Sequence, residues 1–169
     1  MGDYRRSTRE CNVDRLRPEL VEAIRAHAQE HELGDVEREA LICCETTNEK
    51  HKSGGLFGKL LGGDPDKVHY TGLVVTPRWL IWAISGAKRG VTVLSSRLHD
   101  LEARDFESTP MYQMLQKQGK TEMLDAGLEV TGFFSDRLER GTMFIGLGPE
   151  PAAQQMRDVL KDAVKKAQG

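Results

Sequence analysis

The apolar stretch from Val68 to Ile84, VHYTGLVVTPRWLIWAI, constrains the fold more than any other part of the chain. It is rich in the β-branched and aromatic residues that favour strands. The stretch is interrupted at Thr76-Pro77-Arg78, where a proline in the second position favours a tight turn. The sequence therefore predicts two neighbouring strands that are joined at this corner.

Both faces of the predicted strand pair are apolar. Alternation by residue number groups Val74, Leu80, Trp82 and Ile84 on one face, and Leu73, Val75, Trp79, Ile81 and Ala83 on the other. A sheet with one wet face alternates apolar with polar residues, so this pair needs a cover on each side. One available cover is a predicted helix from Leu16 to Leu33, and the other is a second copy of the chain.

We predict from this composition that the protein is a homo-oligomer, most simply a two-fold dimer. The N-terminal helix or the glycine-rich loop is expected at or near the interface. The residues assigned to this interface are Leu20, Ile24, Trp79 and Ile81.

The rest of the chain predicts more strands and two further helices. Strands are expected at 39–46, 91–95 and 98–106, and a hairpin at 128–134 and 142–147. A short helix should follow Ser108-Thr109-Pro110, and an amphipathic helix should run from Pro151 to Ala167. Residues 1–13 are polar and are expected to be frayed. The fold class is therefore mainly β with added α: about seven antiparallel strands in a sandwich or barrel, a C-terminal capping helix and an extra N-terminal helix.

Strands followed by one terminal helix, together with the segment Val74-Val75-Thr76-Pro77-Arg78-Trp79-Leu80-Ile81, resemble the bacterial pleckstrin-homology-like domains. A second segment, Leu98-His99-Asp100-Leu101-Glu102, matches loosely another strand signature of that family. The resemblance covers about residues 38–167, and we expect a tail and helix at 1–34 and the domain itself at 35–169. It implies a fold that mostly binds lipids, peptides or its own copies rather than one that catalyses a reaction.

Composition excludes several classes of function. The chain has 169 residues, a net charge of −2 and an isoelectric point near 6.2, so no global basic field predicts nucleic-acid binding. No apolar run is long enough to span a bilayer, and the N-terminal residues lack the apolar core of a signal peptide. Three cysteines are too few for a disulfide framework, which makes a reducing cytoplasm the simplest expected location.

Four patterns resemble catalytic or metal-binding motifs. His27-Ala28-Gln29-Glu30-His31 has the spacing of an inverted zinc-peptidase motif, which leaves a zinc-dependent hydrolase as an alternative. The segment 53–59, SGGLFGK, departs from a phosphate-binding loop at two positions, because Ser53 replaces a glycine and Leu60 follows the lysine. Ser95-Ser96 and His99-Asp100 contain triad residues without a nucleophile elbow, and the adjacent Cys43 and Cys44 are typical of core cysteines. We therefore predict no enzyme, no catalytic residue, no metal and no cofactor.

The glycine-rich loop between Asn48 and Lys67 is the strongest candidate for a contact surface. Its basic and apolar residues suit a membrane or a partner: Lys50, Lys52, Leu56, Phe57, Lys59, Leu60 and Leu61. In phosphoinositide-binding members of the resembled family, this loop holds a lysine and the next strand holds two basic residues. The corresponding positions here are Lys52, Lys67 and His69, and the histidine stands where that pattern has arginine.

The sequence thus predicts a non-catalytic interaction module that binds a protein partner or its own copies. Peripheral binding to anionic lipid through residues 48–67 is the alternative. The identity of any partner does not follow from the residues.

Overall fold

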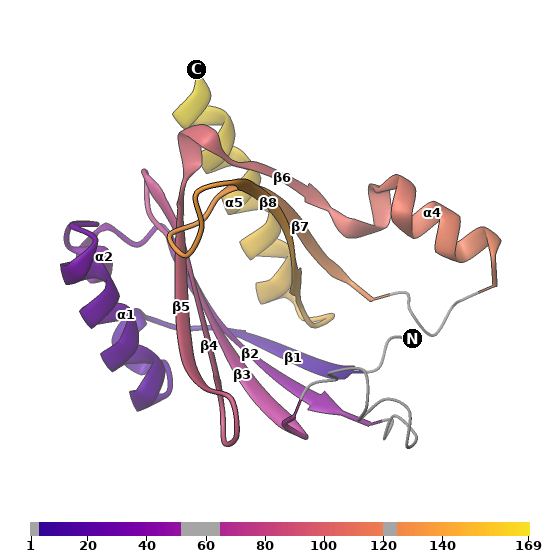
Figure 1. The fold of residues 1–169 in the computed structure, drawn as a ribbon, viewed down its shortest axis with the longest axis horizontal. Helices are drawn as coiled ribbons and strands as arrows, with labels where there is room; N and C mark the ends of the chain where they lie inside the picture. The colour runs from indigo at the N-terminus through magenta and orange to yellow at the C-terminus, as the bar shows by residue number, and fades with distance from the viewer. Residues whose placement is uncertain (1–3, 52–64, 120–124) are drawn as a thin grey trace.

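The computed structural model describes residues 4–51, 65–119 and 125–169, which form two antiparallel sheets and several helices (Figure 1). The first sheet contains, in spatial order, β1 (Tyr4–Glu10), β2 (Ile42–Lys50), β3 (Val68–Val75), β4 (Trp79–Gly86) and β5 (Gly90–Arg97). The second contains β6 (Glu102–Asp105), β7 (Gly127–Phe133) and β8 (Arg140–Gly146). The helices are α1 (Pro18–Glu30), α2 (Val36–Glu39), α4 (Pro110–Lys117) and α5 (Pro151–Gln168), with short 3-10 turns at η1 (Val13–Arg15), η2 (Leu98–Asp100) and η3 (Phe106–Ser108). The predicted β-rich class with a C-terminal helix is confirmed.

The corner between β3 and β4 depends on the buried hydroxyl of Thr76. Its Oγ1 accepts hydrogen bonds from the backbone N–H groups of Trp79 at 3.0 Å and Arg78 at 3.3 Å. The Thr76 N–H in turn donates to the Trp79 carbonyl at 2.9 Å, which closes the turn. Pro77 has no backbone N–H, so each backbone N–H group of the corner has a hydrogen-bond acceptor. The two strands and the corner are therefore confirmed as the sequence predicted them.

Replacing Thr76 by valine should destabilise the protein by about 1–3 kcal/mol, because two backbone donors lose their acceptor beside a fully buried side chain. Urea unfolding followed by circular dichroism measures the change. Thr131→Val is the matched control, since the Thr131 hydroxyl bonds to Thr142 in an exposed position. An equal loss in the two variants would contradict the proposed role of the Thr76 hydroxyl.

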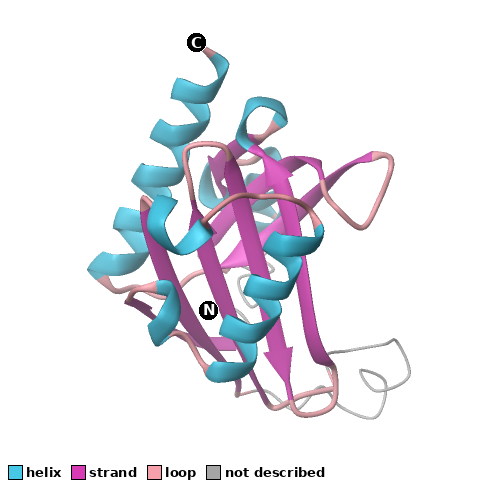
Figure 2. Ribbon diagram, turned by 90° about the vertical axis from the view of Figure 1, so that its left-hand side faces the viewer, coloured by secondary structure: helices cyan, strands magenta, loops and turns pink. Residues whose placement is uncertain are grey.

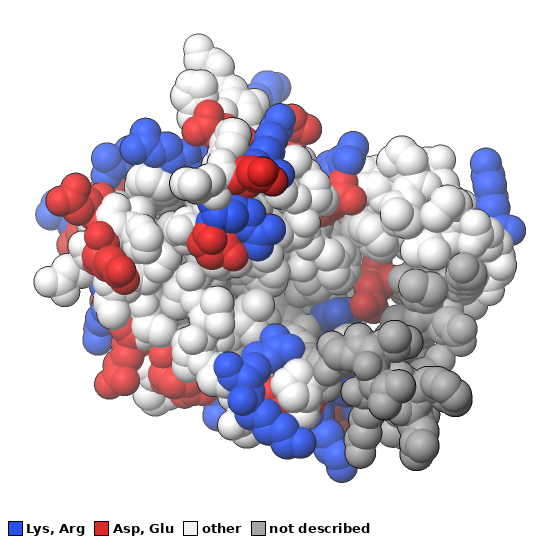
Figure 3. All heavy atoms as spheres, viewed as in Figure 1, with Lys and Arg blue, Asp and Glu red and all other residues white. Residues whose placement is uncertain are grey.

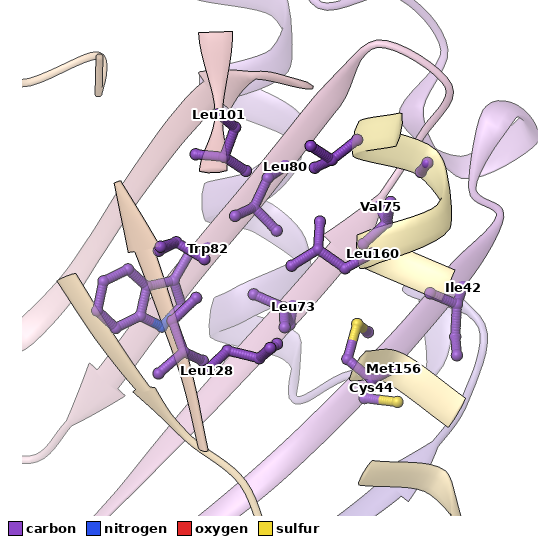
Figure 4. Packing of buried hydrophobic residues seen from close by; sticks show 14 of the residues in the cluster. Ile42, Cys44, Leu73, Val75, Leu80, Trp82, Leu101, Leu128, Met156 and Leu160 are labelled. Carbon is purple, nitrogen blue, oxygen red and sulfur yellow. The ribbon is translucent and has the colours of Figure 1, made fainter. Parts of the chain in front are cut away.

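The inner face of the first sheet forms the main core. Leu73, Val75, Leu80 and Trp82 pack there against β7, β8 and α5, and Figure 4 shows Met156 and Leu160 of α5 extending into the same cluster. The grouping by residue number was wrong across the corner: Val74 pairs with Ile81 on the outer face, not with Leu80 and Trp82. The three-residue corner shifts the alternation by one position. The prediction that Trp79 and Trp82 lie on opposite faces is confirmed.

Helix α1 covers the outer face of the first sheet (Figure 2). Leu20 and Ile24 of α1 are both 0% exposed, as is Ile81 beneath them. The helix is thus the cover that the chain itself provides, and three of the four residues assigned to a dimer interface lie inside the protein. Homo-oligomerisation remains a prediction, but it no longer follows from an uncovered face.

The predicted frayed N-terminus is wrong, because residues 4–10 form strand β1 along the edge of β2. Its inward-facing positions are polar, and they form hydrogen bonds to residues that are distant in the sequence. Thr8 is 2% exposed, and its hydroxyl bonds to the Thr46 hydroxyl and accepts from the Gly148 N–H, both at 2.8 Å. The Thr8 N–H donates to the Glu150 carboxylate at 2.8 Å. Residues 4–34 therefore pack on the same sheet as the strands that follow them.

Two predicted strands differ most from the observed ones. The strand expected at 39–46 begins later, at Ile42, because Asp35 caps the short helix α2 by accepting from the Arg38 N–H. Leu41, which was expected inside this strand, is 53% exposed. The strand expected at 98–106 is divided into η2, β6 and η3. Chain reversals at Leu98 and Phe106 explain the division, since each turn closes with an i to i+3 bond.

Ion pairs hold α5 against the second sheet. Arg157 is 7% exposed and contacts Asp105 at 3.0 Å and Glu107 at 3.1 Å. Lys161 reaches the other oxygen of Asp105 at 2.8 Å. Burial raises the pKa of Asp105, but hydrogen bonds from Lys161 and Arg157 outweigh it and hold that pKa below its ordinary value. None of the described helices combines the length and the apolarity that crossing a membrane requires.

Candidate functional site

Two pockets of about 330 and 350 Å³ share Trp79 and Arg97 as walls, at the edge where the corner meets the end of β5. We call this surface the Trp79 groove. The first pocket is bounded further by Leu33, Ser96 and Phe133. The second is bounded by Arg78, His99 and Ala167. The groove therefore collects side chains from the end of α1, the corner, β5, the end of β7 and the end of α5.

The centre of the groove is a cation–aromatic pair. Strand register places Arg97 of β5 directly opposite Trp79 of β4, and the guanidinium carbon lies 5.2 Å from the centre of the indole ring. Arg97 is exposed and forms no ion pair with any described residue. Phe133 is 50% exposed on the adjacent wall, whereas Phe134 is buried behind it. The surface thus offers one free guanidinium beside aromatic area.

Two buried polar atoms of the groove have no hydrogen-bond partner among the described residues: Trp79 Nε1 and Ser96 Oγ. Indole nitrogen is a donor only, and a serine hydroxyl both donates and accepts. A buried polar atom without a partner is unfavourable, so a ligand that supplies an acceptor gains from this arrangement. Ser96 is 1% exposed and lines the first pocket.

His27 and Ser95 anchor α1 to the sheet behind the groove. His27 Nε2 and Ser95 Oγ lie 2.9 Å apart in a buried hydrogen bond, and the His31 ring packs 4.2 Å from the His27 ring. Burial lowers the pKa of His27, and the neighbouring His31 lowers it further. Ser135 adds two bonds to Ser95: its N–H donates to the Ser95 carbonyl at 2.9 Å, and its hydroxyl accepts from the Ser95 N–H at 3.1 Å. Hydrogen bonds behind the groove therefore link three segments: α1, β5 and the segment at Ser135.

The structure does not bring the residues of the triad-like pattern together. Ser95 bonds to His27 instead of His99, and His99 lies exposed with its Nδ1 3.9 Å from Asp100. One nitrogen of His27 is used by Ser95, and the part of the chain that the structure describes contains no group of three or more His, Cys, Asp or Glu side chains that could hold a metal. Cys43 and Cys44 are buried, as predicted, and lie on opposite faces of the sheet.

Stability should fall as the pH drops below about 6.5, because the unfolded chain protonates His27 at its ordinary pKa of 6.5 while the folded chain resists protonation. Because its pKa is lowered in the folded chain, neutral His27 contributes stability that is fully present above pH 6.5. This stability is lost as the pH falls from 6.5 through the folded pKa. Urea midpoints at about pH 7.5 and about pH 5 measure the slope. His27→Gln should flatten it and the exposed His99→Gln should not; equal slopes in all three proteins would contradict the assignment to His27.

Those of the predicted lipid-contact residues that the structure describes lie at the end of β2 and the start of β3, away from the Trp79 groove. Lys50 and Lys67 are neighbours there, since the Lys50 N–H donates to the Lys67 carbonyl at 2.8 Å. His69 lies with its ring 5.3 Å from that of Tyr4. Lys52, Leu56, Phe57, Lys59, Leu60 and Leu61 lie outside the described residues.

The turn between β4 and β5 adds basic residues at this end. Asp66 accepts from the backbone N–H groups of Lys88 and Arg89, which fixes the turn beside Lys67. Figure 3 shows Lys and Arg side chains gathered at the lower end of the molecule, where this turn lies. We call Lys50, Lys67, Lys88 and Arg89 the basic end.

Sequence reasoning singled out Trp79 but missed Arg97, Ser96 and Phe133 as members of a site. Comparisons with protein-family models, with curated proteins and with solved structures returned no match to this chain. The geometry of the described residues therefore carries the functional argument alone.

Proposed function

We propose that the chain is a non-catalytic interaction module that binds a segment of a protein partner in the Trp79 groove. The observation that carries this proposal is the exposed guanidinium of Arg97 over the Trp79 ring, beside the half-exposed Phe133. Aromatic residues and arginine are enriched in the energetically important parts of protein interfaces.

The chemistry of the groove favours a segment with an apolar side chain and a nearby carboxylate. The apolar side chain would pack between Phe133 and Leu33 in the first pocket. The carboxylate would pair with Arg97, whose planar fork suits two parallel hydrogen bonds.

We propose that the chain is related to the pleckstrin-homology-like domains that its sequence resembles. The resemblance implies about seven antiparallel strands followed by a helix, and the proposal assigns these to β2–β8 and α5, with β1 and α1 as additions. Such domains mostly bind peptides, lipids or copies of themselves. We propose that the module acts in the cytoplasm, because a reducing compartment is the usual one for a protein with free thiols.

Selection from a random peptide library on the immobilised full chain tests this function. We expect enriched peptides that carry Asp, Glu or a free carboxyl terminus next to an apolar residue. Arg97→Glu should reduce the binding of those peptides at least tenfold, because it replaces attraction by repulsion of the carboxylate. Fluorescence polarisation measures each affinity.

Lys88→Glu is the matched control, since it makes the same change of charge at the other end of β5, in an exposed turn. Trp79→Phe separates the ring from its N–H and should weaken binding by a smaller factor. Enrichment of peptides that bind Arg97→Glu as tightly as the unaltered chain would refute the groove as the site.

Anionic lipid is a second candidate ligand, supported by the basic end. Its four side chains come from three neighbouring segments at one end of the first sheet. Sedimentation with anionic vesicles should show salt-sensitive binding that a Lys50→Glu, Lys67→Glu and Lys88→Glu triple variant loses and Arg97→Glu keeps. Sedimentation equilibrium of the full chain measures the predicted self-association.

A further inference from the structure

Cys11 and Cys43 form a cross-strand pair just beyond the end of β1. The register that pairs Glu10 with Cys44 continues by one residue, so Cys11 lies opposite Cys43. The Cys11 N–H donates to the Cys43 carbonyl at 3.0 Å. Residues directly opposite in antiparallel strands point to the same face of the sheet.

The pair lies in the wall of a pocket of about 350 Å³, which we call the Cys11 pocket. Cys11 is partly exposed there, whereas Cys43 is 3% exposed beneath it. Cys44 is separated from both, because its side chain lies in the inner core with its Sγ 3.8 Å from the Ala152 carbonyl. The fold thus gives the three thiols three different degrees of access.

The two cysteines differ in exposure and in acidity. The neighbouring Cys43 thiol lowers the pKa of Cys11, and the Arg9 guanidinium acts in the same direction against the effect of burial. The neighbouring Cys11 thiol and burial raise the pKa of Cys43. Burial raises the pKa of Cys44 to about 12. The thiolate is the reactive form of cysteine, so Cys11 is the nucleophile of the pair.

We propose that Cys11 and Cys43 form a redox-active dithiol site that is oxidised by small, uncharged disulfides entering the Cys11 pocket. The Cys11 thiolate attacks one sulfur of RS–SR, breaks the S–S bond and releases RS⁻, which takes up a proton. The Cys43 thiol then loses its proton, attacks the Cys11 sulfur and releases the second RS⁻. Two protein thiols are oxidised to one disulfide, and one small disulfide is reduced to two thiols.

The backbone geometry accommodates this bridge. Opposite residues of a hydrogen-bonded antiparallel pair have Cα atoms about 5.5 Å apart, within the range found for disulfides. Their Cβ atoms must approach by roughly 1 Å, and Cys11 can yield because β1 has ended at Glu10. Carboxylates of Glu10, Asp14 and Glu37 line the pocket, so an uncharged disulfide enters more readily than an anionic one.

The test uses the reduced full chain and 2-hydroxyethyl disulfide as the probe. We expect the chain to lose two hydrogen atoms, and mass spectrometry of proteolytic fragments to locate a Cys11–Cys43 link that dithiothreitol reverses. Cys43→Ala should instead retain the probe as a mixed disulfide on Cys11. In the folded chain, iodoacetamide should label Cys11 at least about tenfold faster than Cys43 or Cys44, and in guanidinium the preference should disappear.

Cys44→Ala is the matched control and should form the same link as the unaltered chain. If Cys43→Ala fails to fold by circular dichroism, Cys43→Ser and the fragment map of the unaltered chain still decide the result. The proposal is overturned if the folded, unaltered chain keeps the probe on Cys11, if it does not react while the unfolded chain does, or if the link includes Cys44.

Discussion

An Ile24→Asp chain is expected to be largely unfolded in water at neutral pH. Ile24 is 0% exposed in the cluster between α1 and the outer face of the first sheet. An aspartate there loses the packing of the isoleucine and buries a carboxylate with no cation beside it. The combined cost exceeds about 4 kcal/mol, which is a large part of the 5–15 kcal/mol that stabilises a typical domain. Far-ultraviolet circular dichroism and size-exclusion chromatography measure the loss.

Ala26→Asp is the matched control, because Ala26 is exposed two positions along the same helix. It introduces the same charge with a larger loss of helix propensity, yet it buries nothing polar, so it should remain folded. A folded Ile24→Asp chain would show that α1 does not need to cover the sheet. In that case a second copy of the chain would again be the expected cover of the outer face.

Arg157→Ala is expected to destabilise the protein by about 2–4 kcal/mol at neutral pH, measured by urea unfolding. Removing one partner of a buried ion pair costs about 3–5 kcal/mol when the remaining charge is buried. The estimate is reduced here because Asp105 and Glu107 are each more than a third exposed to water. The loss comes from two carboxylates that remain beside the apolar part of α5.

The difference between Arg157→Ala and the unaltered chain should shrink as the pH falls. The folded pKa of Asp105 lies below its ordinary value of 3.8, so the stability gained from its ion pairs is present above 3.8 and lost as the pH falls through the folded value. Lys166→Ala is the control, since its ion pair with Asp162 lies on the exposed face of α5. A difference that stays constant down to about pH 2 would contradict this electrostatic explanation.

The parts of the fold that the sequence predicted are those whose signals are local. The corner needed only a buried threonine, a proline and two apolar flanks, all within a few residues of Thr76. Helix α5 was predictable because a proline begins it and its buried residues, such as Met156 and Leu160, recur at helical spacing. Neither inference required knowledge of a distant contact.

Strand β1 and the Trp79 groove escaped prediction because their signals are not local. Thr8 is a buried strand residue only because Thr46, Gly148 and Glu150 satisfy its polar groups. The groove needs Arg97 and Phe133 to meet at the edge where the two sheets approach each other. Neither residue belongs to a motif, so only the arrangement of the chain in space identifies them.

The anchoring of β1 has a consequence for how the protein is made. β1 leaves the ribosome before the other described elements, yet the groups that hold Thr8 in place lie about 140 residues later in the chain. At typical rates of about 5–20 residues per second, synthesis takes roughly 7–28 seconds to reach the residues that anchor this strand. Contacts between such distant segments also slow folding itself. The N-terminal edge is therefore expected to be the last part of the sheet to become secure, after synthesis has reached Gly148 and Glu150.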